Sequence, residues 1–199
     1  MRHTTLFLIA LLCCPLTALA EPATAVFAGG CFWCMESDYE KVEGVSGVVS
    51  GFTGGSLQNP TYSGNHEGHF EAVEVTYDPE VISYQQLLDL FWRSIDPLDN
   101  IGQFCDKGPS YRSAIFVSDA SQRALAEASK AAVAERFSDH TVYTEILDAG
   151  TFWPVEEYHQ NYYLKNPIRY KYYRWNCGRD QRLKQLWGDE AAAHADDSP

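Results

Sequence analysis

The strongest signal in the chain is Ala25-Val26-Phe27-Ala28-Gly29-Gly30-Cys31-Phe32-Trp33-Cys34, where an apolar run gives way to a cysteine and two aromatic residues. A cysteine between a strand and a helix lies among free backbone N–H groups, and there the helix dipole favours thiolate over thiol. The two glycines let another molecule approach the backbone, and the two aromatic rings can line a small apolar pocket. We therefore expect Cys31 to be a nucleophile beside a substrate pocket.

The first twenty residues have the pattern of a secretory signal peptide. Arg2 and His3 provide a positive start, residues 6–12 form an apolar centre, and Ala18-Leu19-Ala20 is a small-x-small cleavage site. The apolar run is too short to span a bilayer. We expect cleavage after Ala20 and export of a soluble, monomeric protein to the periplasm or the exterior.

Composition places the remaining chain among acidic globular proteins. The 199 residues carry a formal net charge of −12, and removal of residues 1–20 would take away Arg2 and two of the six cysteines. An acidic surface argues against nucleic acid and anionic membranes as partners. The length is ample for one packed core. We expect a single catalytic domain over residues 21–188 and a disordered, Ala/Asp-rich tail over residues 189–199.

The order of strands and helices predicts an α/β (α+β) fold. Strand–helix–strand–strand–helix–strand is the order of a ferredoxin-like split βαβ core, a two-layer sandwich of one sheet with helices packed on one face. A further helix and strand follow, so we expect a mixed sheet. The predicted strands are residues 24–28, 45–51, 70–77, 113–117 and 142–147, and the predicted helices are residues 31–41, 83–94 and 120–136.

Two connections are longer than a compact domain needs. Residues 51–69 and residues 96–111 are both rich in glycine, proline and polar side chains. Loops of this length usually carry function. We expect both of them to bring side chains to Cys31.

A series of short motifs occurs in one order along the chain: Gly30-Cys31-Phe32-Trp33, Gly51-Phe52-Thr53-Gly54-Gly55, Asn59-Pro60-Thr61-Tyr62, Gly68-His69-x-Glu71, Gln103-x-Cys105-Asp106, Tyr111-Arg112-Ser113-Ala114-Ile115, Tyr158-His159-Gln160 and Asn166-Pro167. Together they resemble the A-type peptide methionine sulfoxide reductases over essentially the whole mature chain. The resemblance implies that family's α/β sandwich and reduction of the S epimer of methionine sulfoxide, free or in proteins, with no metal or organic cofactor.

The same resemblance implies roles for individual residues. A sulfoxide oxygen leaves only if it is protonated as a thiolate attacks sulfur, which requires a carboxylic acid that is neutral near pH 7 and neutral hydrogen-bond donors. The implied assignments are Cys31 as nucleophile, Glu71 as acid, Tyr62 and Tyr111 as donors to the oxygen with Asp106 nearby, and Phe32 and Trp33 as the pocket for the methyl group.

Attack would leave Cys31 as a sulfenic acid, which a second thiol converts to a disulfide. The chain lacks the glycine-rich, cysteine-containing C-terminal tail of many family members. Cys34 is the first candidate because Cys-x-x-Cys at a helix start can close, followed by Cys177 in an Asn-Cys-Gly turn and Cys105 beside Asp106. Electrons would then come from an exported thioredoxin-like partner.

Other interpretations remain open from the residues alone. By its position on a strand Glu71 would face solvent, and His69 and His159 are expected to be structural hydrogen-bonding residues. Cys31 and Cys34 alone would suffice for a dithiol–disulfide exchange enzyme. Two structural disulfides would suit a binding module in an oxidising compartment.

Overall fold

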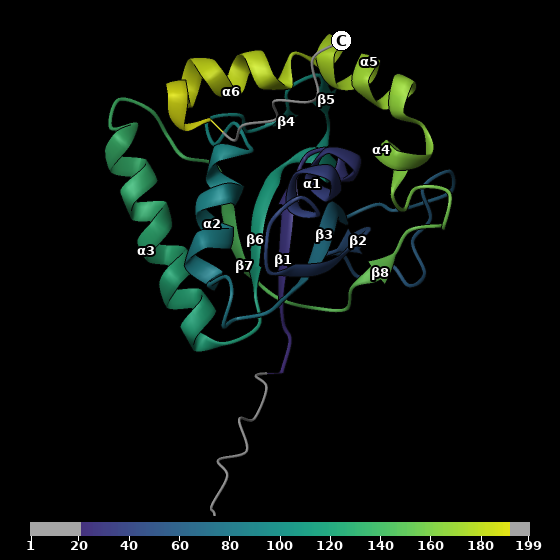
Figure 1. Ribbon diagram of the computed structural model, residues 1–199, viewed down its shortest axis with the longest axis horizontal. Helices are drawn as coiled ribbons and strands as arrows, with labels where there is room; N and C mark the ends of the chain where they lie inside the picture. Colours follow the sequence, from purple (N-terminus) through teal and green to yellow (C-terminus); the bar gives the residue numbers. More distant parts are fainter. Residues whose placement is uncertain (1–20, 192–199) are drawn as a thin grey trace, which may run out of the picture.

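The computed structural model describes residues 21–191 (Figure 1). The predicted signal peptide and residues 192–199 of the predicted tail lie outside the described residues. No helix within residues 21–191 is long and apolar enough to cross a membrane. The strands are β1 Ala23–Gly29, β2 Val45–Thr53, β3 Phe70–Tyr77, β4 Gly102–Gln103, β5 Asp106–Lys107, β6 Ser113–Val117, β7 Glu145–Asp148 and β8 Trp153–Pro154. The helices are α1 Phe32–Tyr39, α2 Tyr84–Arg93, α3 Ala120–Arg136, α4 Tyr162–Lys165, α5 Pro167–Cys177 and α6 Arg179–Trp187, with short 3-10 turns at Pro109–Tyr111 and Gly188–Glu190.

One six-stranded sheet, in the order β7-β6-β1-β3-β2-β8, forms the centre of the molecule. Its four middle strands β6, β1, β3 and β2 pair with one another in antiparallel fashion, which is the ferredoxin-like arrangement. Strand β7 adds in parallel to β6 after the α3 crossover, and β8 adds antiparallel to β2. The predicted α/β fold class with a mixed sheet is confirmed.

The hydrophobic core lies between one face of this sheet and helices α1, α2, α3 and α6. Phe27 of β1 is fully buried and stacks on Tyr39 of α1 at 5.3 Å and on Phe91 of α2 at 5.2 Å between ring centroids. The amphipathic pattern of α2 explains its place, and Ser83 caps the helix in a reciprocal capping box with Gln86. These contacts fix the end of β1 and the start of α1, where Cys31 lies.

The C-terminal third is the part that the sequence did not predict. Helices α4, α5 and α6 run along one end of the sheet (Figure 1), although residues 162–187 are dominated by polar and aromatic side chains without clean helical spacing. The predicted disordered tail also begins too early. Residues 188–190 form a 3-10 turn, and Glu190 pairs with Arg93 at 3.3 Å and with Arg136 at 3.0 Å.

Candidate active site

The cysteine at the end of β1 lies in a tight, buried turn. Cys31 is the N-cap residue of α1 and is 6% exposed. Gly30 precedes it with φ of +84°, and a Cβ atom there would lie 2.6 Å from the Cβ atom of Gln103. Glycine is therefore required at this position, both for its backbone conformation and for the close approach of the loop that carries Gln103.

The carboxyl group of Glu71 accepts a hydrogen bond from the backbone N–H at the start of α1, which we expected to stabilise a thiolate at Cys31. The backbone N–H of Phe32 donates to Oε2 of Glu71 at 3.2 Å, while Cys31 caps the helix only through its carbonyl oxygen. Glu71 is 1% exposed. The expectation that it faces solvent is wrong, because on β3 it shares the helix-covered side with Val73 and Val75.

Burial keeps this carboxyl group protonated near neutral pH. The pKa of Glu71 is raised from 4.5 to about 8. Loss of solvation is the main cause and the charge of Asp106 contributes, while the hydrogen bonds from Phe32 and Tyr111 act in the opposite direction. Its Oε1 atom has no hydrogen-bond partner within the described chain. Glu71 is thus a neutral acid with an open oxygen beside Cys31.

The two free thiols of the described residues are Cys31 and Cys34, both buried and joined by a side-chain hydrogen bond. Burial, this bond and the nearby anionic groups raise the pKa of Cys31. The hydrogen bond lowers the pKa of Cys34 despite its burial, and Arg179 and Arg174 lower it further. Burial and the neighbouring acidic groups therefore oppose the thiolate that we expected at Cys31, because Glu71 occupies the helix N–H and the positive charges of Arg179 and Arg174 act on Cys34.

Two tyrosines from the two long loops lie close enough to Glu71 for its charge to affect them. Burial, followed by the charge of Glu71, raises the pKa of Tyr62 to about 12 and also raises the pKa of Tyr111. Both phenols therefore stay protonated and can donate hydrogen bonds near neutral pH. Tyr62 is 36% exposed and so lies at the open side of the site.

An aromatic wall surrounds the half-buried ring of Trp33. Tyr162 stacks on Trp33 with 3.8 Å between ring centroids, and the indole N–H of Trp33 donates to Nδ1 of His159 at 3.3 Å. His159 in turn lies 4.1 Å from the ring of Tyr62 and 5.8 Å from that of Phe32. These contacts hold the indole plane in one orientation, so the two predicted pocket residues belong to one rigid apolar surface.

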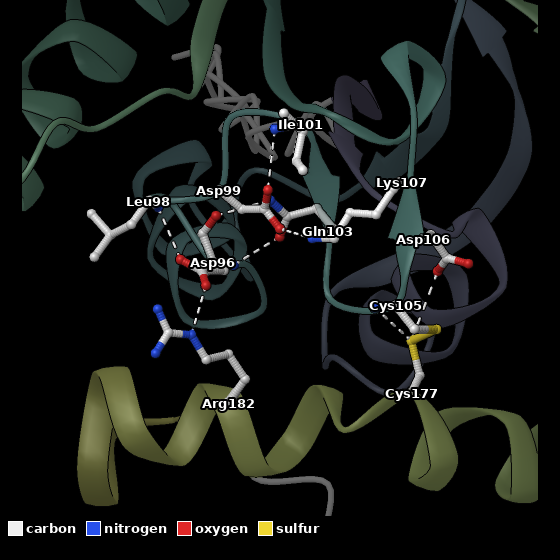
Figure 2. A network of polar contacts seen from close by, with 10 residues as sticks. All are labelled: Asp96, Leu98, Asp99, Ile101, Gln103, Cys105, Asp106, Lys107, Cys177 and Arg182. Carbon is white, nitrogen blue, oxygen red and sulfur yellow. Dashed lines mark hydrogen bonds and ion pairs between the residues drawn. A yellow bond between two sulfur atoms is a disulfide. The ribbon is translucent and has the colours of Figure 1, made fainter.

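Asp106 lies between the buried thiols and a surface disulfide. It follows Cys105, which is bonded to Cys177 at the end of α5 with a Cα–Cα distance of 4.9 Å (Figure 2). The hydroxyl of Tyr173 donates to Oδ2 of Asp106, and this oxygen lies 3.9 Å from Sγ of Cys177. Cys105 and Cys177 therefore offer no thiol in this state. With only one disulfide among residues 21–191, the two-disulfide binding module is wrong.

The loop that carries Asp106 is held by a second set of polar contacts, also seen in Figure 2. The side chain of Gln103 bonds both the N–H and the carbonyl oxygen of Asp96 at 2.8 Å, and Arg182 of α6 reaches the Asp96 carboxylate at 2.7 Å. Gln103 is fully buried. The loop is thus a fixed part of the site.

The structure brings all predicted site residues to one end of the sheet, but sequence reasoning missed several of their neighbours. The motif Tyr158-His159-Gln160 gives no sign in the sequence that His159 accepts a hydrogen bond from Trp33. Nothing local in the sequence indicated that Tyr173, Arg174 and Arg179 reach the site, because α5 and α6 were not predicted.

Together, the fold and the site define a thiol-based oxidoreductase, with a buried cysteine pair beside a neutral carboxylic acid and neutral phenols. The family model described as peptide methionine sulfoxide reductase matches residues 23–191. The chain belongs to this family and is a peptide methionine sulfoxide reductase.

Relatives and solved structures agree with this membership. The chain is 54% identical to MsrA 2 of Caulobacter vibrioides over 177 residues, which cover 87% of this chain and 90% of that protein. It is 49% identical to MsrA of Bacillus subtilis over 169 residues, covering 82% and 95%. Among solved structures, reduced Mxr1 of Saccharomyces cerevisiae has a TM-score of 0.67 at 28% identity, covering 73% of this chain and 86% of that one. Methionine sulfoxide reductase A of Corynebacterium diphtheriae has a TM-score of 0.66 at 31% identity, covering 74% and 76%.

Proposed function

We propose that this enzyme reduces the S epimer of methionine sulfoxide, free or in peptides, through attack of Cys31 on the sulfoxide sulfur. The observation that carries the proposal is the place of Glu71, a buried carboxyl group with a pKa of about 8 whose partner N–H belongs to the residue after Cys31. At neutral pH this acid is protonated. It can therefore give its proton to the sulfoxide oxygen as sulfur is attacked.

The surrounding residues have distinct tasks. The hydroxyls of Tyr62 and Tyr111 donate to the oxygen and stabilise its developing charge without adding a fixed charge. Phe32 and Trp33 hold the methyl group against their rings. Asp106 lies at the same end of the sheet, where the hydroxyl of Tyr173 donates to its carboxylate.

Resolution of the Cys31 sulfenic acid falls to Cys34. Its thiol is free and already hydrogen-bonded to Cys31, whereas Cys105 and Cys177 are bonded to each other. Attack of Cys34 on Cys31 releases water and leaves a Cys31–Cys34 disulfide.

An external dithiol must then reduce this disulfide, and a thioredoxin-like protein is the proposed donor. Yeast Mxr1, which shares the fold, has been solved in complex with Trx2. We further propose that the enzyme works as a monomer without metal or organic cofactor, exported through residues 1–20 to repair oxidised exported proteins. Cell fractionation and the mass of the mature chain test the export: the expected first residue is Glu21.

The deciding experiment offers each epimer of methionine sulfoxide, free and peptide-bound, with dithiothreitol as electron donor. Consumption of the S epimer alone, lost in Cys31→Ser, is the expected result. Consumption of the R epimer, or an active Cys31→Ser enzyme, contradicts the proposal. If neither epimer is consumed by the fully reduced protein, insulin reduction becomes the next assay, since dithiol–disulfide exchange would then be the better assignment.

A further inference from the structure

Arg179, the first residue of α6, is a fully enclosed cation with only neutral partners. It is 1% exposed, and its Nη2 atom donates to the carbonyl oxygens of Gly29 at 3.0 Å and Ser94 at 2.9 Å and lies 3.2 Å from Sδ of Met35. Its Nε atom has no hydrogen-bond partner, and none of the ion pairs found among residues 21–191 includes it. A buried cation without an anion is costly, so this site calls for a negative charge nearby.

The nearby Arg174 differs in this respect. Arg174 is also fully buried, but it is bound to Asp38 at 2.7 Å and to Asp180 at 2.8 Å. Two carboxylates already balance its charge. Arg179 has no carboxylate in contact within residues 21–191. Its positive charge acts instead on Cys34 and on Asp106, whose pKa it lowers against the effect of burial.

The residues that flank the cysteine pair in sequence contact the Arg179 guanidinium group. The partners of Arg179 include Gly29, two residues before Cys31, and Met35, the residue after Cys34. A Cβ atom at Gly30 would lie 3.8 Å from Nη1 of Arg179, so the guanidinium group lies over the turn that precedes Cys31.

Other groups around Cys34 leave Arg179 as the least compensated positive charge. Arg174 and Asp38 act on Cys34 with opposite signs and are paired with each other. Tyr170 and Tyr173 stay protonated, because burial raises the pKa of each. Around Cys31 the acidic groups are the protonated carboxyl of Glu71 and the carboxyl of Asp106, and a negative charge on either would disfavour a thiolate there.

We propose that Arg179 is a positioning residue that keeps the sulfur of Cys34 negatively charged in the resting enzyme, so that Cys34 accepts the proton of Cys31 when Cys31 attacks the sulfoxide. The inference rests on the proposed function and deepens it. Cys34 acts first as a base and then as the resolving nucleophile.

The protons and electrons of this cycle balance. Cys31 passes its proton to Cys34 and attacks the sulfoxide sulfur, while Glu71 gives its proton to the sulfoxide oxygen. The protonated oxygen is transferred to the sulfur of Cys31, which becomes the sulfenic acid, and methionine is released. The Cys34 thiol then attacks Cys31, and its proton departs with the hydroxyl group as water. A donor dithiol reduces the disulfide; of its two protons, one returns to Cys31 and one to Glu71.

The first test locates the thiolate by its ultraviolet absorbance as pH is raised. Cys31→Ser keeps a hydroxyl donor towards Cys34, so this variant is expected to retain one thiolate near neutral pH. Cys34→Ser is expected to show none until the pH is well above neutral. The reverse pattern, with the thiolate lost in Cys31→Ser and retained in Cys34→Ser, overturns the proposal. This test requires no substitution of Arg179.

The second test asks whether Arg179 is the cause. Arg179→Met in the Cys31→Ser background should move the titration of Cys34 to higher pH, and Arg179→Lys should restore part of the shift. Lys184→Met is the matched control, because Lys184 is a cation on the same helix but is exposed. Unchanged titration in a folded Arg179→Met variant refutes the role of Arg179.

A third measurement separates failure of this inference from failure of the proposed function. Fully reduced enzyme without a donor is mixed with the sulfoxide, and methionine formed in a single turnover is measured by rapid quench. Cys34→Ser is expected to slow this step by about tenfold or more near neutral pH, where Glu71 still holds its proton. A normal rate in Cys34→Ser refutes the base role alone, whereas no methionine from the wild type refutes the proposed function.

Discussion

The two cysteine pairs of this enzyme lie near each other and differ in almost every physical respect. Cys31 and Cys34 are three residues apart at the start of one helix, buried, and free. Cys105 and Cys177 are 72 residues apart and bonded, and Cys105 is exposed. The free pair, Cys31 and Cys34, is thus enclosed by the protein, and we call it the inner pair. Cys105 and Cys177, the outer pair, are already oxidised.

This difference indicates that the two cysteine pairs have different roles. Around the inner pair, burial, two arginines and two carboxyl groups set which sulfur carries charge. The outer pair instead ties the short hairpin of β4 and β5 to α5, and so holds Asp106 against Tyr173. The same type of side chain therefore forms a cross-link in one place and is the proposed reagent in the other.

The largest expected effect comes from the inner pair. Cys31→Ser should lower kcat/KM for methionine S-sulfoxide by about 10⁴-fold or more, because the nucleophile is removed. Steady-state reduction with dithiothreitol measures it. The Cys105→Ser/Cys177→Ser double variant is the counterpart and should retain most of the activity with this small donor. An equal loss of activity in both variants would contradict the different roles of the two cysteine pairs.

Glu71→Gln should reduce kcat by about 10²-fold to 10⁴-fold with little change in KM, since the amide has no acidic proton. The wild-type kcat should fall as pH rises through about 8, where Glu71 loses its proton. The kinetic pH profile of both enzymes measures this. A change confined to KM would make Glu71 a substrate-positioning group.

The same carboxyl group predicts a stability effect. Its pKa is raised on folding from 4.5 to about 8, so the folded state holds the proton more tightly and stability falls as pH rises across this range. The wild type should lose about 2–4 kcal/mol through this group between pH 5 and pH 8. Urea unfolding at the two pH values should show a smaller loss for Glu71→Gln.

Removal of the Cys105–Cys177 disulfide should lower the stability of the fold more than it lowers the catalytic activity. Cys105→Ser/Cys177→Ser removes a cross-link over a sequence separation of 72 residues, so the free energy of unfolding should fall by about 2–4 kcal/mol. Urea denaturation under non-reducing conditions measures the loss. Wild type treated with a strong reductant is the control and should shift in the same direction.

The smallest effect is expected at the residue between the pairs. Tyr173 donates to Asp106 and its ring meets Trp33 edge-on at 5.9 Å. Tyr173→Phe keeps the ring contact and removes one hydrogen bond to a carboxylate, so activity should fall by about two- to tenfold. Trp175→Phe, an exposed change on the same helix, is the control. A loss as large as that of Glu71→Gln would place Tyr173 in the chemistry itself.

The sequence predicted the first two thirds of the fold because local patterns there agree with tertiary demands. Strand β3 shows why: its alternation gave its limits, and the structure has it at Phe70–Tyr77 as predicted. Helix α3 was likewise predicted with its correct bounds from an Ala-rich run, and in the structure Asp119 caps it. The alternation also put Glu71 in phase with Val73 and Val75, a signal that a stricter count of faces would have used.

Residues 162–187 escaped prediction for a physical reason. Their buried side chains include two arginines and two tyrosines, and these become core residues only through partners that are distant in sequence, as Arg174 does through Asp38. No periodicity of apolar residues marks such a helix. The same is true of His159, whose contact with Trp33 spans 126 positions.

By itself, the sequence determined the family, the nucleophile candidate, and the alternation of strands and helices, because these depend on residue type and on spacing over a few positions. Tertiary structure alone decided that Cys105 meets Cys177, that Glu71 is a buried acid, and that Arg179 contacts the residues that flank the cysteine pair. Pairing, burial and local charge depend on which distant segments pack together. A sulfur or carboxyl group acquires its pKa only from those neighbours.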